Sequence, residues 1–191
     1  MADFPYLVGY PAEDLSKYRP GGYHPVHLGD LYKAGRYRII HKLGWGGYST
    51  VWLARDEEAS QNVALKINTS DAPPIRNELT TLQQIQQIHV NETPPSIAGA
   101  VKLLDEFQIY GPNGNHQCIV TELLGPTISM TLEEYDLPSR RLSPKWAKGV
   151  TRQLLTTLGS LHQHGIAHGG KTLWTLWNRR MSTNLSYRCT Y

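Results

Sequence analysis

The fold predicted for this chain follows from one stretch, Leu43-Gly44-Trp45-Gly46-Gly47-Tyr48-Ser49-Thr50-Val51. It separates two strand-like segments, 37–43 and 50–56, so it is predicted to form the tip of a β-hairpin. Glycines at such a tip let backbone N–H groups approach phosphate oxygens, because no Cβ stands in the way. A dinucleotide-binding loop would need a helix directly after the glycines, and the strand-like pattern of 50–54 disfavours that alternative.

Two charged residues follow the glycines in an informative order. A third strand-like segment, 62–67, contains Val63-Ala64-Leu65-Lys66, and a lysine on a strand beside the loop can reach nucleotide phosphates. Apolar residues at steps of three and four over 75–88 predict a helix that carries Glu78. A carboxylate there can pair with Lys66, as in protein kinases. Taken singly, Lys66 is more typical of a solvated strand edge and Glu78 of a helix surface, but the ordered set favours the ATP-binding lobe of a protein kinase.

The remaining pattern extends this lobe. Segments 101–110 and 117–124 flank an Asn113-Gly114 step that favours the positive φ of a hairpin turn. Ser143-Pro144 is typical of a helix start, and apolar residues continue at helical spacing until Gly165, namely Trp146, Val150, Leu154, Leu158 and Leu161. The expected fold class is therefore α+β, a five-stranded antiparallel sheet with one helix, followed by the first helical part of a second lobe.

Five runs of residues are informative as a set. They are Gly21-Gly22-Tyr23-His24-Pro25-Val26, Gly29-Asp30-Leu31, Gly35-Arg36-Tyr37, Lys42-Leu43-Gly44-Trp45-Gly46 and Ser49-Thr50-Val51-Trp52-Leu53. The tryptophan inside the loop and the last run are unusual among kinases in general. Through these five runs the chain resembles the SR-protein kinase family over about residues 18–169. Residues 1–36 are rich in Pro, Gly and Tyr and are expected to form an extended arm that ends in a turn around Gly29-Asp30. The resemblance implies an ATP-binding N-lobe (37–124) and a partial C-lobe (125–169). Residues 170–191 have no sustained period and form a tail foreign to the family.

The resemblance also implies an activity and a site. The family transfers phosphate from ATP, with magnesium, to serines of Arg/Ser-rich splicing proteins in the cytoplasm and nucleus. In this chain Ala64 would touch the adenine ring, Thr121 would be the gatekeeper, and the backbones of Glu122 and Leu124 would hydrogen-bond adenine. The ATP-binding set is then Leu43, Gly44, Trp45, Gly46, Gly47, Tyr48, Ser49, Thr50, Val51, Ala64, Lys66, Glu78, Thr121, Glu122 and Leu124.

The family pattern breaks at Gly170. Residues 161–169 resemble the end of the long C-lobe helix and the opening of the catalytic loop, where an aspartate should come next. No Asp or Glu occurs from 169 to 191, so the group that accepts the substrate hydroxyl proton is absent from this stretch. The magnesium-binding segments are absent as well, so no catalytic residue and no metal ligand is assigned. A read-through intron is one hypothesis for this break. Gly170-Lys171 can be encoded GGT-AAG, and a G followed by GTAAG is expected where an exon ends inside an aspartate codon and its intron is read through.

Composition and charge narrow the classes of partner and compartment that are expected for this chain. A length of 191 residues fits one domain or part of a larger protein. The net charge is +3 with basic residues scattered, which favours neither a nucleic-acid nor a membrane partner. Cys118 and Cys189 indicate neither a disulfide framework nor a zinc site, and no apolar run is long enough to span a membrane, so a soluble intracellular protein is expected.

Three functions remain open from the sequence. The first is a kinase-family ATP-binding fragment without phosphotransfer, and the second is a non-catalytic module that binds nucleotide or partners of the full-length enzyme. A third, remote alternative is a membrane-surface helix at 173–180. We also expect the region after Gly125 to be loose, because the apolar face of the second helix would lack its C-lobe partners.

Overall fold

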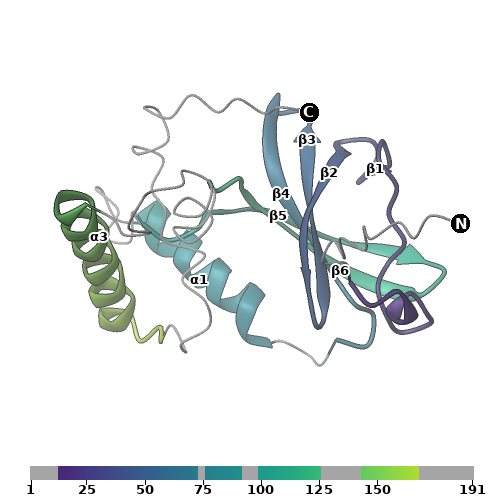
Figure 1. Cartoon of the computed structure of the whole chain (residues 1–191). Helices are drawn as coiled ribbons and strands as arrows, with labels where there is room; N and C mark the ends of the chain where they lie inside the picture. Colours follow the sequence, from purple (N-terminus) through teal and green to yellow (C-terminus); the bar gives the residue numbers. More distant parts are fainter. Residues whose placement is uncertain (1–12, 73–75, 92–98, 126–142, 168–191) are drawn as a thin grey trace, which may run out of the picture. The chain divides into compact units, whose positions relative to one another are not determined.

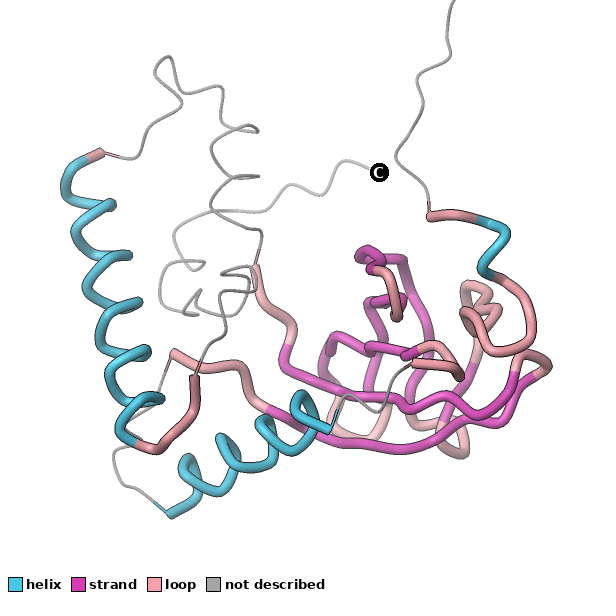
Figure 2. Tube along the Cα trace, turned by 90° about the horizontal axis from the view of Figure 1, so that it is seen from below, coloured by secondary structure: helices cyan, strands magenta, loops and turns pink. Residues whose placement is uncertain are grey.

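The computed structural model describes residues 13–72, 76–91, 99–125 and 143–167 (Figure 1). These residues contain a 3-10 helix, six strands and two α-helices, coloured by type in Figure 2. In chain order they are η1 (Leu15–Lys17), β1 (Leu31–Tyr32), β2 (Tyr37–Gly46), β3 (Ser49–Asp56), β4 (Gln61–Asn68), α1 (Arg76–Asn91), β5 (Leu103–Gly111), β6 (Gly114–Glu122) and α3 (Pro144–Gln163).

The strands form one sheet in the order β1-β2-β3-β4-β6-β5, and β1 to β4 pair antiparallel. The predicted α+β class is confirmed, as are the five predicted strands. The predicted number of strands was wrong by one, because β1 adds a sixth. Only two residues long, β1 is too short to show an alternating pattern, and its pairing with β2 defines it.

The chain divides into two compact units. One contains residues 1–74 and 106–119, and we call it the sheet unit. The other contains residues 75–105 and 120–191, and we call it the helical unit. The domain boundaries expected from the sequence, at 36, 124 and 169, stay predictions.

The core of the sheet unit is built by alternation along β3 and β4. Trp52 and Ala54 on β3 are buried, as are Val63, Leu65 and Ile67 on β4. The residues between them are only half-buried, so each strand has one core face and one more open face. Period-two burial of this kind is what the sequence pattern predicted.

The described residues before β2, 13–36, contribute to the core of the sheet unit. This segment was expected to be an extended arm, and the predicted turn near Gly29 is present, with φ of +89° at that glycine. Within the segment, however, Tyr23 and Tyr32 are buried. A Cβ at Gly22 would overlap the backbone carbonyl of Lys17, so the chain folds back on itself where only glycine fits.

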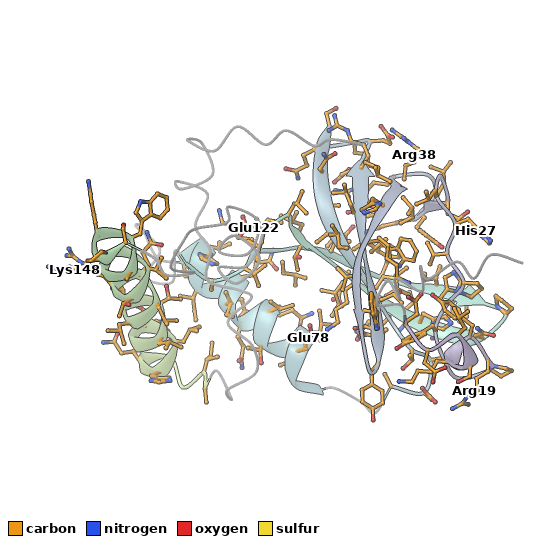
Figure 3. All side chains as sticks on the ribbon, viewed as in Figure 1. Arg19, His27, Arg38, Glu78, Glu122 and Lys148 are labelled. Carbon is orange, nitrogen blue, oxygen red and sulfur yellow. The ribbon has the colours of Figure 1, made fainter. Side chains whose placement is uncertain are left out.

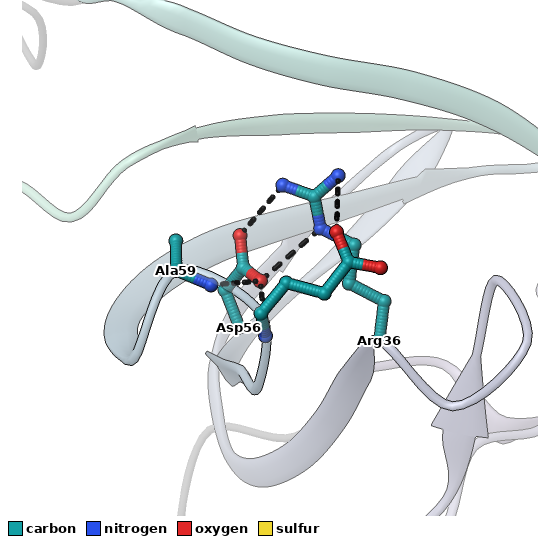
Figure 4. Close-up of polar contacts among 4 residues, drawn as sticks. Arg36, Asp56 and Ala59 are labelled. Carbon is teal, nitrogen blue, oxygen red and sulfur yellow. Dashed lines mark hydrogen bonds and ion pairs between the residues drawn. The ribbon is translucent and has the colours of Figure 1, made fainter.

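An ion cluster closes the turn between β3 and β4 (Figure 4). Arg36 donates two hydrogen bonds to the buried carboxylate of Asp56, from Nε at 3.1 Å and from Nη2 at 2.9 Å. The N–H groups of Glu58 and Ala59 donate to Oδ1 of the same carboxylate, each at 3.1 Å. The hydrogen bond from Arg36 is the main cause that lowers the pKa of Asp56.

In the helical unit, α3 begins and ends as predicted. Ser143 caps its N-terminus, Pro144 is its first residue, and Gly165 follows its end with φ of +72°. Leu161 packs in a small cluster with Ile85, Ala100 and Ile166. The expectation that the apolar face of this helix is left exposed was therefore wrong for Leu161, which is buried.

Helix α3 remains sparsely buried elsewhere. Trp146 is 39% exposed and Leu155 is 63% exposed. No helix within the four described ranges is long and apolar enough to cross a membrane. The predicted tail, 170–191, and the segment 173–180 lie outside the described residues.

Candidate functional site

The glycine-rich stretch forms the end of the β2–β3 hairpin, as predicted. Gly46 pairs with Ser49, which leaves Gly47 and Tyr48 as the two residues of the turn. Both turn residues are exposed to solvent. The tip therefore presents backbone rather than a packed core.

Lys66 lies in one row with the glycines across three strands. Gly44 is opposite Val51, and Val51 is opposite Lys66. Directly opposed residues share a face of a sheet, so the lysine and the glycine lie on the same side. Ala64 lies two residues before Lys66 and belongs to the same face.

Two irregularities in β2 create this row. The register shifts once between Ile39 and His41 and again between Lys42 and Gly44. Without them, the pairing that starts at Tyr37 with Asp56 would bring Lys42 opposite Val51. The bulges thus place a residue without a side chain, in place of a lysine, in the row of Lys66, with Val51 between the two.

The backbone is open at two glycines of the hairpin, Gly44 and Gly47. A Cβ built at Gly44 or at Gly47 would meet no atom within 4 Å, so a ligand can approach the backbone there. Backbone N–H groups and the Lys66 ammonium are both donors toward phosphate oxygens. Among the described residues, no group of three or more His, Cys, Asp or Glu side chains is arranged to hold a metal ion.

The predicted site residues outside the β2–β3 hairpin and β4 belong to the helical unit. Glu78 lies in the first turn of α1, and Glu122 ends β6 (Figure 3). Thr121 precedes Glu122 on the strand, and Leu124 follows in the loop. Because Lys66 belongs to the sheet unit, its pairing with Glu78 stays a prediction. The contacts of Ala64, Thr121, Glu122 and Leu124 with adenine also stay predictions.

Glu122 is anchored through both its backbone and its side chain. Its N–H donates to the Lys102 carbonyl at 3.2 Å, and its Oε1 accepts from the Lys102 N–H at 3.0 Å. This double contact with one residue fixes the end of β6. The segment that should meet adenine therefore starts from a fixed backbone position.

Sequence reasoning missed a set of contacts to the hairpin tip. Hydroxyl Oη of Tyr23 donates to the Gly46 carbonyl at 2.6 Å, and Nζ of Lys17 lies 3.4 Å from the Gly47 carbonyl. Tyr23 stood in a run that was noticed for its resemblance to a family, yet nothing local to that run indicates a partner 23 residues away.

The chain is similar in sequence to serine/threonine protein kinases. No protein-family model matches the chain. Serine/threonine-protein kinase SKY1 of Saccharomyces cerevisiae is 39% identical over 163 residues, which are 82% of this chain and 21% of that protein. Serine/threonine-protein kinase SRPK of Physarum polycephalum is 40% identical over 154 residues, 78% of this chain and 34% of that protein.

A human protein kinase is similar to this chain over a comparable share of its length. SRSF protein kinase 3 of Homo sapiens is 35% identical over 151 residues, which are 78% of this chain and 26% of that protein. The matched part of the chain thus spans 21% to 34% of the length of these three relatives, while most of its own length is matched.

Proposed function

Because this chain is a homologue of the SR-protein kinases over about four-fifths of its length, we propose that it binds ATP as the N-lobe of such a serine/threonine kinase does. The row formed by Gly44, Val51 and Lys66 carries the proposal. It combines an open backbone on β2 with a cation on β4, on one face of the sheet, and a triphosphate needs both hydrogen-bond donors and positive charge.

Each part of the site has a proposed role. The glycine-rich tip offers N–H groups to the phosphates, and Lys66 binds them as a point charge that Glu78 orients. Ala64 and the backbones of Glu122 and Leu124 hold adenine, with Thr121 as the gatekeeper. In the family, magnesium bound with ATP neutralises phosphate charge. The residues that would hold it are not assigned in this chain.

We further propose that the chain as written does not transfer phosphate. The stretch 169–191 contains no Asp or Glu, so no carboxylate follows His168-Gly169 to accept the proton of a substrate hydroxyl. Arg/Ser-rich proteins are the proposed partners, in the cytoplasm and nucleus, by analogy with the SRSF and SRPK kinases named above. The same break supports the second candidate, a non-catalytic module that binds nucleotide or partners.

Titration of the whole chain with ATP tests nucleotide binding. Lys66→Met should weaken the binding of ATP at least about tenfold, because it removes the positive charge proposed to bind the phosphates. Lys145→Met provides a matched control, since this exposed lysine is at the start of α3. Equal ATP affinities for the wild type and Lys66→Met would overturn the proposed site.

Phosphate transfer to an Arg-Ser peptide separates an active kinase from a binding module. We expect no turnover above that of Lys66→Met. Turnover that Lys66→Met abolishes would contradict our interpretation of Gly170. Sequencing the message across codons 165–175 then shows whether a spliced form encodes aspartate after Gly169.

A further inference from the structure

The carbonyls at the hairpin tip are bound from outside the hairpin. Gly46 O accepts from the hydroxyl of Tyr23 at 2.6 Å. Gly47 O has the Lys17 ammonium at 3.4 Å, and Tyr48 O accepts from the Thr69 N–H at 2.9 Å. Three consecutive carbonyls of an exposed, glycine-rich turn therefore have fixed partners, of which the contact with Tyr23 is the shortest.

A bound carbonyl fixes the direction of the next N–H. In a trans peptide the C=O of one residue and the N–H of the next lie in one plane and point in opposite directions. The hydroxyl of Tyr23 on Gly46 O therefore turns the Gly47 N–H away from Tyr23. Lys17 on Gly47 O acts in the same way on the Tyr48 N–H. Successive N–H groups that point to one side form an anion-binding concavity.

Tyr23 is itself held rigidly enough to act as an anchor. Its ring is 2% exposed, and its N–H donates to the Lys17 carbonyl at 2.9 Å. Its carbonyl accepts from Asn113 Nδ2 at 2.6 Å, and the Asn113 carbonyl accepts from the Gly21 N–H at 2.8 Å. The β5–β6 turn, which contains Asn113, thus positions the tyrosine that positions the glycine-rich tip.

Neighbouring contacts fix the same segment on its other side. The N–H of Asp71 donates to the Gly21 carbonyl at 2.7 Å, and the N–H of Ser70 donates to the Gly22 carbonyl at 3.3 Å. Gly22 has no room for a side chain, as described above. Each of these groups belongs to the sheet unit, so the whole connection lies within one compact part of the chain.

We propose that Tyr23 is a positioning residue for the phosphates of the nucleotide, acting through the Gly46–Gly47 peptide. This inference rests on the proposed ATP binding and deepens it. Tyr23 touches no nucleotide itself. Its hydroxyl orients the N–H of Gly47 before the ligand arrives, which lowers the ordering cost of binding a phosphate.

Paired titrations with ATP and adenosine test the proposal. Tyr23→Phe should weaken the binding of ATP about three- to tenfold, which corresponds to the loss of one hydrogen bond. The affinity for adenosine should be unchanged, because adenosine has no phosphate. Tyr18→Phe is the matched control, since the hydroxyl of Tyr18 binds Glu13 instead of the tip. Equal losses for ATP and adenosine, or no loss for ATP, would overturn the role of Tyr23.

A measurement without ligand keeps the two proposals distinguishable. Nitrogen-15 relaxation of the free chain should show larger fast motion at the amides of Gly47 and Tyr48 in Tyr23→Phe, with no change at Asn115. If the wild type binds neither nucleotide, ATP binding fails, and this measurement still decides whether Tyr23 orders the tip. An unchanged tip in Tyr23→Phe overturns the inference.

A second variant covers the case in which Tyr23→Phe does not fold. Lys17→Met removes the ammonium from the Gly47 carbonyl and from the face of the Tyr23 ring, 5.8 Å from the ring centroid, and keeps the tyrosine hydroxyl on the Gly46 carbonyl. It should increase the fast motion of the Tyr48 amide and weaken the binding of ATP about twofold. The affinity for adenosine should again be unchanged. No change in either quantity would show that bonds to these carbonyls do not position the tip, which contradicts the mechanism assigned to Tyr23.

Discussion

The middle of the sheet unit and helix α3 of the helical unit differ in how much of each element is buried. On β4, Val63, Leu65 and Ile67 are at most 1% exposed. On the 20-residue helix α3, only Thr157 and Leu161 are buried. A central strand is covered along its length by neighbours, whereas a helix needs a partner along its apolar stripe. Among the described residues, the comparison teaches that β4 contributes more to stability than α3 does.

The largest expected effect compares one leucine from each region. Leu65→Ala should cost about 2–5 kcal/mol of unfolding free energy, because it leaves a cavity in a closed core. Leu161→Ala should cost less, about 1–2 kcal/mol, because its cluster is small and can relax. Urea unfolding and amide exchange resolved by segment would measure both. Equal losses for the two variants would contradict the comparison.

A second substitution tests the polar closure of the sheet unit. Asp56→Ala should cost about 2–3 kcal/mol, because Arg36 and two backbone N–H groups lose their acceptor. Glu57→Ala is the matched control. Its ion pair with Arg38, at 2.7 Å, is exposed and should contribute less than about 1 kcal/mol. Thermal unfolding followed by circular dichroism would compare the two.

Limited proteolysis sharpens the contrast between the regions. Trypsin should cut at Lys145, Lys148 or Arg152 of α3 about tenfold faster than at Arg55 or Lys66 of the sheet, because sparsely buried elements open more often. Mass spectrometry of the early fragments measures the order. Persistent protection of residues 143–163 would show that α3 is as stable as the sheet.

The smallest expected effect is a dependence of stability on pH. The pKa of Asp56 is lowered in the folded chain by the hydrogen bond from Arg36. A lowered folded pKa means that the carboxylate stabilises the fold above its unfolded pKa, about 3.9, and that this contribution is lost as the pH falls through the folded pKa. Asp56→Asn should flatten the loss of stability below about pH 4. Parallel acid titrations followed by tryptophan fluorescence would show it.

The elements that could be predicted are those with a local signal. The strands predicted at 37–43, 50–56 and 62–67 are present as β2, β3 and β4, because strand-forming residues between glycine-rich or polar turns are a property of neighbouring residues. The burial of Tyr23 was not found, because its segment is irregular and its partners, Gly46 and Asn113, lie far away in the sequence. Irregular backbone is held by such distant hydrogen bonds, which no periodicity records.

The candidate site also has a part that the sequence predicts and a part that only the folded chain decides. Alternation alone places Ala64 and Lys66 on one face of a strand, and the glycines alone indicate an open turn. Which residue lies in the row with Lys66 depends on two register shifts in β2, and these bring Gly44 there instead of Lys42. Pairing between strands minimises a free energy that includes every neighbour in the sheet, so only the folded chain decides it. The orientation of the Gly47 N–H has the same origin, because it depends on a tyrosine hydroxyl brought to the tip by the tertiary structure.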